Sequence, residues 1–545
     1  MKKANLRGAT IALMIFILVI SLAYYGAYYN KLAYPVKDYG CLLSGGARVS
    51  SGQMPYINFF SYYPPLRYLV LGGWFKMLGV SVESSQLLLA FLLTLSNLLL
   101  FLVACRFLPR ILALIPVIIH LIMPGPWWKV WFMLSVLTGL LFILRYIERP
   151  DKLRASLAGF ACGIMIWIRQ DIGCYLLLTL AVIFVITYLK KTPLRNFIYC
   201  VSGGIASGMT FIFYYMLRGG NIVDFFRDTL WTVYITRQAA GDAARFWVYP
   251  NTLFGIAGIL FMFIFAFIIY KRREDMTLFT RLCALLIMTG FCFFHMQIGS
   301  FKYYRFPQDQ ALMYIIMVFI GLETYRLMAG KTNKMLVRVS SSLVLVFIIS
   351  GISFYSYYTF FALSKSGYFA YTGILPYFKK NWQKTNIERM GNVMIKREKA
   401  MAFKNAIKAI DSAAEVNEDV FYGSNAFLAF LSAHPTPARE DVVYFLFADK
   451  SVMRDFLERA KEKAPKVVVL SAVDRRIARR NPEENIRPVL DFVKNNYDFS
   501  EKVGRYYVFV KAENPDRIET EKRLNSLFFG GGKKEKSARA KHDYE

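Results

Sequence analysis

An apolar run at residues 10–29, TIALMIFILVISLAYYGAYY, indicates a membrane protein, and it follows Lys2, Lys3 and Arg7. About 20 consecutive residues of this kind are enough for one helix to cross the roughly 30 Å of hydrocarbon in a bilayer. No small-residue cleavage site ends the run, so we interpret it as a retained first span rather than a signal peptide. The basic residues ahead of it predict a cytoplasmic amino terminus.

Composition extends this interpretation to most of the chain. Of 545 residues, 56% are hydrophobic, 17% are aromatic and only 19% are charged, which excludes a disordered or ordinary soluble protein. The net charge of +30 could indicate nucleic-acid binding. However, Lys and Arg fall in short clusters between apolar runs, which is typical of a multi-spanning membrane protein. We therefore expect membrane lipids as partners and no nucleic acid.

Eleven spans are predicted. After residues 10–29, the apolar runs lie near 87–103, 111–123, 129–147, 155–168, 173–189, 196–217, 250–270, 279–299, 310–328 and 338–361. The run at 66–78 is only about 13 residues long, too short to cross a bilayer, and carries Arg67 and Lys76 near its ends. It predicts an interfacial or re-entrant helix.

The positive-inside rule supports this count. With the amino terminus inside, all five inner connections are basic: Arg106/Arg110, Arg145/Arg149/Lys152/Arg154, Lys190/Lys191/Arg195, Lys271/Arg272/Arg273 and Arg326/Lys331/Lys334/Arg338. Counting 66–78 as a full span would put all five outside. The odd number of spans places everything after residue 361 outside. The lack of a retention signal favours a plasma (inner) membrane, so we expect this side to be periplasmic or extracellular.

The chain changes character after this α-helical, polytopic membrane domain at 1–361. Charged residues return, and we expect helices over 399–410, 453–463 and 486–496 and strands over 419–423, 467–470 and 506–510. Strands alternating with helices indicate a small soluble α/β domain at 362–514. The polar, Lys/Arg-rich end with three glycines at 530–532 predicts a basic, disordered tail over 515–545.

The outer loop at 31–65 contains one acid, Asp38, close to the membrane. A lone carboxylate there is a candidate general base, which can take a proton from an acceptor hydroxyl. Pairing with Lys37 or Arg48, or capping a following helix, are the structural alternatives.

Two further outer segments combine charge and aromatic residues. Arg169 and Asp171 lie in a short turn between two spans, which polar residues and a glycine suit equally well. Lys302, Arg305 and their neighbours lie in KYYRFPQDQ, residues 302–310. Clustered outward-facing cations need an anionic partner, either a bound phosphate or lipid headgroups, and arginine binds phosphate bidentately.

Several other chemistries lack their signatures. The four histidines and seven cysteines form no metal-ligand spacing, and the sequence contains neither a Walker loop nor a dinucleotide fingerprint. We expect no zinc site and no ATP-driven step, and we leave a divalent metal open.

The order of these features resembles the GT-C superfamily of glycosyltransferases. The shared pattern is a basic first span, an early outer Asp, Gly-x-x-Pro-Tyr at 52–56, Tyr-Pro-Pro-Leu-x-Tyr-Leu at 63–69 and Phe-Lys-x-x-Gly at 75–79. The nearest branch is that of the protein O-mannosyltransferases and the bacterial lipid A aminoarabinose transferases. The Arg305-x-x-x-Asp309 segment is similar to an Arg/Asp motif of the later outer loops.

The resemblance implies inverting transfer of a sugar from a polyprenyl-phosphate donor to an acceptor hydroxyl or amine. Asp38 would be the catalytic carboxylate, with Asp171 as the other acidic contributor. Cations would hold the donor phosphate, namely Arg305, Lys302, Arg169 and Arg48. Sugar contacts would come from Tyr56, Tyr62, Tyr63, Tyr304 and Asp309, although interfacial anchoring also explains the tyrosines.

Two departures from the family pattern bear on metal binding. Tyr39 follows Asp38 where many relatives have a second acid, and Asn58 stands where Asp is common. Both argue against a metal ion coordinated in this loop.

Two other functions stay open at this point. A transporter or flippase of lipid-linked glycans predicts a charged cavity deep in the bundle. A polymerase or ligase of such glycans is usually built with one long outer loop and no terminal domain. The acceptor is equally open between lipid, polysaccharide and protein.

Overall fold

The fold is that of a computed structural model, which describes residues 2–30, 37–61, 63–122, 124–125, 127–188, 194–231, 251–298, 311–329, 382–423, 425–437, 439, 450–471 and 487–528. The chain forms two compact units. The first unit comprises residues 1–28, 89–214 and 242–376, and the second comprises residues 29–88, 215–241 and 377–545.

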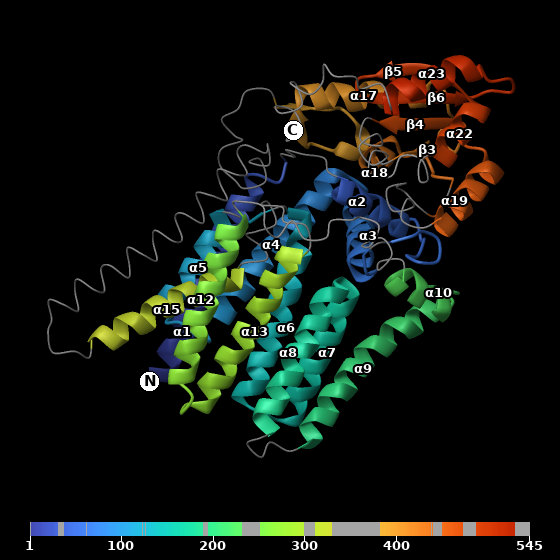
Figure 1. The fold of residues 1–545 in the computed structure, drawn as a ribbon. Helices are drawn as coiled ribbons and strands as arrows, with labels where there is room; N and C mark the ends of the chain where they lie inside the picture. The colour runs from blue at the N-terminus through green and yellow to red at the C-terminus, as the bar shows by residue number, and fades with distance from the viewer. Residues whose placement is uncertain are drawn as a thin grey trace. The chain divides into compact units, whose positions relative to one another are not determined.

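Long helices build the first unit (Figure 1). They are α1 (Lys2–Gly26), α4 (Val82–Ala104), α5 (Arg110–Ile122), α6 (Val130–Glu148), α7 (Lys152–Ile168), α8 (Gln170–Tyr188), α9 (Leu194–Leu217), α12 (Asn251–Lys271), α13 (Met276–Ile298) and α15 (Ala311–Ala329). One end of α4 and one end of α9 belong to the second unit. Among the described residues, six helices are long and apolar enough to cross a membrane. The predicted helical membrane fold is confirmed.

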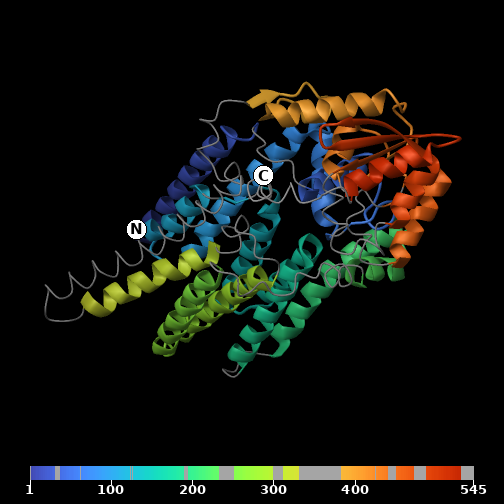
Figure 2. The same cartoon turned by 45° about the horizontal axis from the view of Figure 1, so that its top comes forward.

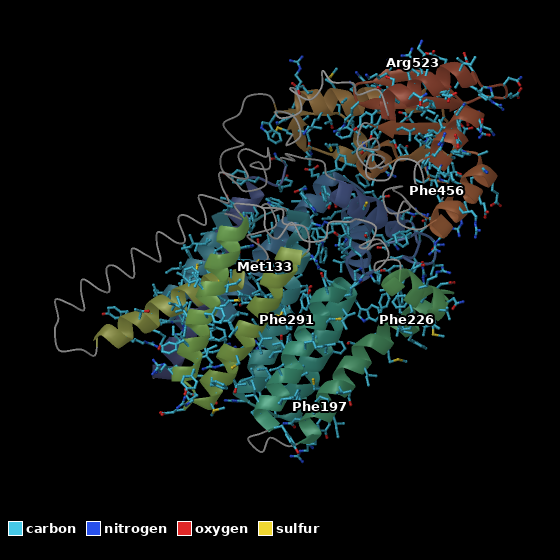
Figure 3. All side chains as sticks on the ribbon, viewed as in Figure 1. Met133, Phe197, Phe226, Phe291, Phe456 and Arg523 are labelled. Atoms are coloured by element: carbon cyan, nitrogen blue, oxygen red, sulfur yellow. The ribbon has the colours of Figure 1, made fainter. Side chains whose placement is uncertain are left out.

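Each helix of this set coincides with a predicted span. The eleventh predicted span, 338–361, lies outside the described residues, so the total of eleven stays a prediction. Large apolar side chains on the outside of the helices agree with a lipid environment: Phe197 on α9, labelled in Figure 3, is 43% exposed and Phe213 is 62% exposed.

Helices α7 and α9 approach each other closely through glycines. A Cβ atom added to Gly159 would lie 1.9 Å from the carbonyl oxygen of Cys200, and one added to Gly203 would lie 2.1 Å from that of Ser156. Such small residues let backbones meet where lipid provides no hydrophobic drive for association.

Polar side chains also join helices of the first unit. Asn97 on α4 donates to Ser21 Oγ and Tyr25 Oη of α1 at 3.0 and 3.2 Å, and its Oδ1 lies 2.6 Å from His120 Nδ1 of α5. All four side chains are fully buried. Glu323 of α15 is buried and pairs with Arg272 and Arg326, so its charge is compensated.

The second unit contains two helices that follow the first span. Helix α3 (Leu66–Leu78) has the bounds of the predicted interfacial helix. Helix α2 (Lys37–Ser50) occupies much of the segment expected to be a loop. Gly45 and Gly46 lower helix propensity but let α2 pack against Tyr68 and Leu71 of α3, and this packing outweighs propensity.

The expected α/β domain is present in the second unit (Figure 2). Four strands lie in the order β3 (Val420–Tyr422), β4 (Val467–Ser471), β6 (Tyr506–Lys511) and β5 (Tyr497–Val503). Strands β3 and β4 are parallel, and the other pairs are antiparallel. A separate antiparallel pair joins β1 (Trp382–Lys384) to β2 (Met394–Lys396).

Helices cover both faces of the four-stranded sheet. On one face, α19 (Lys450–Lys463), α22 (Arg487–Asn496) and α23 (Arg517–Phe528) pack a core that includes Phe456, Phe492 and Leu527 with Phe509 of β6. On the other face, α17 (Arg397–Asp411) places Phe403 near Tyr506 of β6 and near Phe427 of α18 (Ala426–Ser432).

Residues 517–528 differ from the sequence-based expectation. Their polar composition predicts a disordered tail, yet they form α23 (Arg517–Phe528). Leu524 and Leu527, on one face of this helix, are buried in the domain core, and Thr520 donates a hydrogen bond to the carbonyl of Tyr497. Residues 529–545 lie outside the described residues.

Candidate active site

The candidate catalytic acid, Asp38, lies in the first turn of α2, and its side chain is outside the described part of the structure. Cys41, one turn later, is close enough to Tyr68 of α3 to influence the pKa of that hydroxyl. Helix α2 contacts the first turn of α3 through Gly45, where an added Cβ atom would lie 2.5 Å from the ring of Tyr68.

A strained turn at residues 54–59 connects these two helices. Tyr56 has φ +65°, a left-handed conformation that costs a non-glycine residue about 1–3 kcal/mol. Three hydrogen bonds of at most 2.9 Å hold the turn. Tyr56 N–H donates to Phe59 O, Asn58 N–H donates to Met54 O, and Met54 N–H donates to Asn58 Oδ1. Asn58 therefore serves as a hydrogen-bonding residue of the turn.

The side chain of Tyr56 ties this turn to the start of α3. Its ring is buried, and its hydroxyl donates to the carbonyl of Tyr63 at 3.0 Å. Ser61 Oγ donates to the same carbonyl at 2.6 Å. Burial raises the pKa of Tyr56 above its ordinary value, so the phenol remains a neutral donor.

Arg67, in the first turn of α3, is a buried cation with 4% exposure. Helical side chains lean toward the amino terminus, and its guanidinium carbon lies 3.2 Å from the ring centroid of Tyr63 and 5.3 Å from that of Tyr68. Its Nε is buried without a hydrogen-bond partner, and no ion pair to it occurs among the described residues. An isolated buried charge is costly, so Arg67 is suited to an anionic partner.

The backbone around Arg67 has the same preference. The N-cap of α3 is Pro65, which makes no side-chain cap, and the first turn contains no acidic residue. The amino end of a helix carries partial positive charge and free N–H groups that favour an anion. The nearby hydroxyl of Tyr68 is neutral as well, because burial raises its pKa to about 12 despite the opposing effect of Arg67.

Arg48, at the end of α2, donates hydrogen bonds to neutral groups. Its Nε donates to Gln53 Oε1 at 2.7 Å, and its Nη2 donates to the carbonyl of Asn58 at 2.9 Å. Its Nη1 lies 3.5 Å from Thr436 Oγ1 in the α/β domain. These contacts make Arg48 a support of the 52–60 segment.

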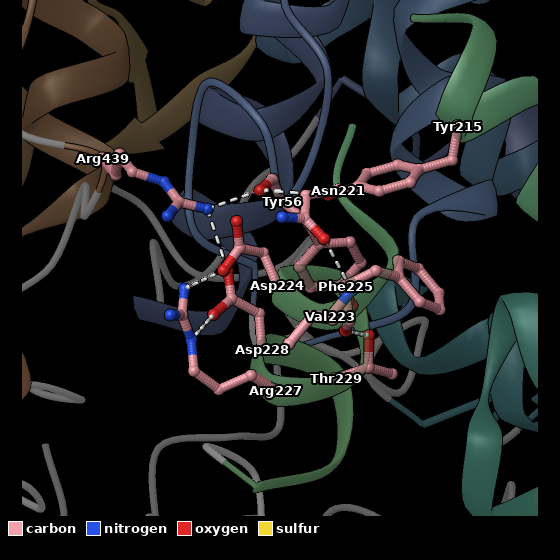
Figure 4. A network of polar contacts seen from close by, with 10 residues as sticks. All are labelled: Tyr56, Tyr215, Asn221, Val223, Asp224, Phe225, Arg227, Asp228, Thr229 and Arg439. Atoms are coloured by element: carbon pink, nitrogen blue, oxygen red, sulfur yellow. Dashed lines mark hydrogen bonds and ion pairs between the residues drawn. The ribbon is translucent and has the colours of Figure 1, made fainter. Parts of the chain in front are cut away.

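A second polar cluster adjoins the strained turn (Figure 4). It comprises α10 (Ile222–Phe226), the following π-helical turn (Arg227–Trp231) and Arg439. Arg439 Nη2 donates to Asp228 Oδ2 at 2.8 Å and to the carbonyl of Tyr56 at 2.5 Å. Arg227 pairs with Asp224 at 3.1 Å and with the buried Asp228 at 3.3 Å.

In the first unit, Arg169 and Asp171 form a bidentate pair. Arg169 Nε and Nη2 donate to the two carboxylate oxygens at 2.9 and 2.7 Å, and Arg169 lies over the ring of Phe132. Each charge is compensated by the other in this arrangement. The pair links the end of α7 to the start of α8, as a turn between two helices requires.

The remaining predicted site residues cannot be placed. Tyr62, Lys302, Tyr304, Arg305 and Asp309 lie outside the described residues. Among the residues that the structure describes, no group of three or more His, Cys, Asp or Glu could hold a metal ion.

Two residues of the site escaped the sequence analysis. Arg67 was visible only as a charge near the end of a short apolar run, and its burial depends on tertiary packing. The detectable signal was an arginine in the first turn after Tyr63-Pro64-Pro65 with no acid beside it. Arg439 contacts Asp228 and Tyr56, which lie 211 and 383 positions earlier in the chain. Sequence spacing gives no signal for pairs so far apart.

Comparisons with known proteins find similar chains among solved structures. No protein-family model matches the chain, and no curated protein matches it. Among solved structures, the chain is similar to ArnT from Cupriavidus metallidurans bound to undecaprenyl phosphate, at 12% identity and a TM-score of 0.49, with 93% of this chain and 98% of that chain covered. It is also similar to the Archaeoglobus fulgidus oligosaccharyltransferase in the apo form, at 13% identity and a TM-score of 0.48, with 92% and 74% covered. The archaeal oligosaccharyltransferase AglB from Archaeoglobus fulgidus, in complex with an inhibitory peptide and a dolichol-phosphate, matches at 12% identity and a TM-score of 0.47, again with 92% and 74% covered.

Proposed function

We propose that this protein is a membrane glycosyltransferase that moves a sugar from a polyprenyl-phosphate donor to an acceptor hydroxyl or amine at the outer membrane face. The GT-C-like order of motifs in the sequence supports this assignment. The observation that carries it is Arg67, a buried cation at an uncapped helix amino terminus with no ion-pair partner among the described residues.

A phosphate monoester is the chemistry that fits Arg67. The guanidinium can donate two parallel hydrogen bonds to phosphate oxygens, and the free N–H groups of the first turn of α3 can donate further ones. Because Arg67 is buried, these interactions are stronger than they would be in water. Arg305 and Lys302 are proposed as additional donor ligands, whereas Arg48 and Arg169 are already engaged by protein partners.

Asp38 is the proposed general base. Its carboxylate accepts the proton of the acceptor group while the acceptor oxygen or nitrogen attacks the anomeric carbon of the sugar. The bond between that carbon and the phosphate oxygen breaks, and polyprenyl phosphate leaves with the bonding electrons. Arg67 stabilises the negative charge that develops on this leaving group, as preorganised donors do in transition states. Attack opposite the leaving group inverts the anomeric configuration.

The decisive experiment supplies radiolabelled polyprenyl-phosphate sugars to the purified protein in nanodiscs and measures transfer. Asp38→Asn should lower the rate by roughly 10²–10⁴ because the base is lost while the shape is kept. Arg67→Ala should weaken binding of undecaprenyl phosphate by roughly 1.5–3 kcal/mol, which is about 10- to 150-fold. Arg505→Ala, which removes an exposed arginine of the same unit, is the matched control and should change neither.

Binding must also be specific for the prenyl phosphate. An equal amount of phosphatidylglycerol should not compete with undecaprenyl phosphate, which separates a donor site from a general headgroup site. If the wild-type protein neither binds undecaprenyl phosphate nor consumes any polyprenyl-phosphate sugar, the proposed function is wrong.

A further inference from the structure

Arg439 belongs to the α/β domain in sequence, yet its partners lie in two distant segments of the second unit. It reaches Asp228 in the π-helical turn and the carbonyl of Tyr56 in the strained turn (Figure 4). Its own carbonyl accepts a hydrogen bond from Phe60 N–H at 2.8 Å. Arg439 therefore contacts both ends of the 56–60 segment, with its side chain at Tyr56 and its backbone carbonyl at Phe60.

A continuous series of contacts runs from Arg439 to the proposed phosphate site. Arg439 holds the carbonyl of Tyr56, the hydroxyl of Tyr56 donates to the carbonyl of Tyr63, and the ring of Tyr63 lies against the guanidinium of Arg67. Arg439, Tyr56 and Arg67 are at most 20% exposed at the side chain, so water competes little for these contacts.

The conformation of Tyr56 makes this series sensitive to its first contact. A tyrosine adopts a positive φ only where its surroundings fix that conformation. The N–H of Tyr56 is held inside the turn by Phe59, whereas its carbonyl points to Arg439 and lies 3.5 Å from the hydroxyl of Tyr215. Arg439 supplies the only charged partner of this carbonyl among the described residues.

We propose that Arg439 is a positioning residue for the donor site: anchored by Asp228, it fixes the Tyr56 turn and thereby sets the place of Tyr63 and Arg67. The α/β domain thus completes the phosphate site instead of only covering it. This inference rests on the proposed function, because it assigns Arg67 to the donor phosphate.

The test measures binding of undecaprenyl phosphate to full-length variants in nanodiscs, together with hydrogen exchange of the 52–63 backbone. Arg439→Ala should raise the dissociation constant about tenfold to a hundredfold, since a shift of about 1 Å in a binding group has effects of this size. It should also speed exchange at residues 56–60. Arg505→Ala should leave both measurements unchanged.

A double-mutant cycle distinguishes this role from a general loss of stability. Tyr56→Phe breaks the next contact in the series, so Arg439→Ala combined with Tyr56→Phe should cost no more than the larger single effect. Additive losses would overturn the proposal, because they would mean two independent routes. Arg439→Lys keeps the charge but has a single amino group in place of the planar fork, and should recover only part of the affinity.

The outcomes separate the two proposals. If Arg67→Ala loses binding while Arg439→Ala binds as the wild type does, the positioning role is wrong and the donor site stands. If Arg439→Ala is poorly folded, Asp228→Asn provides the same test, because it keeps the Arg439 side chain but removes the carboxylate that anchors it, and so loosens the contact of Arg439 with the carbonyl of Tyr56. Unchanged binding in a folded Asp228→Asn protein would likewise contradict the proposal.

Discussion

The guanidinium of Arg67 lies over the ring of Tyr63, four residues earlier in the chain, with 3.2 Å between the guanidinium carbon and the ring centroid. An aromatic face attracts a cation without neutralising it. Tyr63 can therefore hold Arg67 in place while its positive charge remains available to a ligand. This differs from Arg169, whose charge is compensated by the carboxylate of Asp171.

The first prediction tests that contact. Tyr63→Leu removes the aromatic face and should weaken binding of undecaprenyl phosphate by about 1–2 kcal/mol, the size of a buried cation–π contact. Tyr63→Phe is the matched control, because it keeps the ring and the backbone carbonyl that accepts from Tyr56. Titration of both variants in nanodiscs measures the difference. Equal losses in the two variants would mean that the hydroxyl, and not the ring, matters.

The second prediction concerns the contact between α2 and the α/β domain. A Cβ atom added to Gly40 would lie 2.4 Å from the backbone nitrogen of Phe427 in α18, and a backbone atom cannot move aside cheaply. Gly40→Ala should therefore destabilise the protein by about 1–3 kcal/mol. Gly73→Ala in α3 is the control, because a Cβ atom there meets nothing within 4 Å. Thermal unfolding in detergent should show a lower Tm for the Gly40 variant alone.

The third prediction tests whether Asp171 stabilises the protein or contributes to the donor site. Its carboxylate accepts two hydrogen bonds from Arg169, and both side chains are mostly buried. We expect Asp171→Asn to lower stability by roughly 1–3 kcal/mol while leaving the KM for the donor unchanged. Glu458→Gln, which breaks a well-exposed pair with Arg454, should leave the Tm unchanged. A changed donor KM in Asp171→Asn would instead place Arg169 in the donor site.

Hydropathy predicted the membrane helices well for a physical reason. A helix that crosses a bilayer needs about 20 apolar residues whatever its neighbours are, so the signal is local. The same reasoning separated the 13-residue run of α3 from the spans, and its bounds agree with the structure. Strands β3, β4 and β6 were also predicted, since their buried runs are continuous and apolar.

The missed elements depend on contacts between distant residues. Helix α2 forms although it contains Gly45 and Gly46, because these glycines admit side chains of α3. Helix α23 buries only a few residues of a polar sequence, so its composition resembles that of a tail. The same limit applies to the site. The sequence does not distinguish an arginine that binds an anion from an arginine on a solvated surface, because the difference lies in burial, which depends on tertiary packing.

The last prediction uses the pH dependence of stability at Tyr68, which lies beside Arg67. Burial raises the pKa of Tyr68 to about 12, whereas an unfolded tyrosine titrates near 10. The folded state therefore holds this proton more tightly. The contribution of the Tyr68 proton to stability is complete below about pH 10 and is lost as the pH rises toward 12, at up to about 1.4 kcal/mol per pH unit.

Tyr68→Phe has no such proton. The difference in Tm between the wild type and Tyr68→Phe should thus be constant from about pH 8 to 9.5 and should shift against the wild type above pH 10. Parallel curves over the whole range would show that the Tyr68 hydroxyl titrates in the folded protein as it does in the unfolded chain, and that the surroundings of Arg67 are open to water.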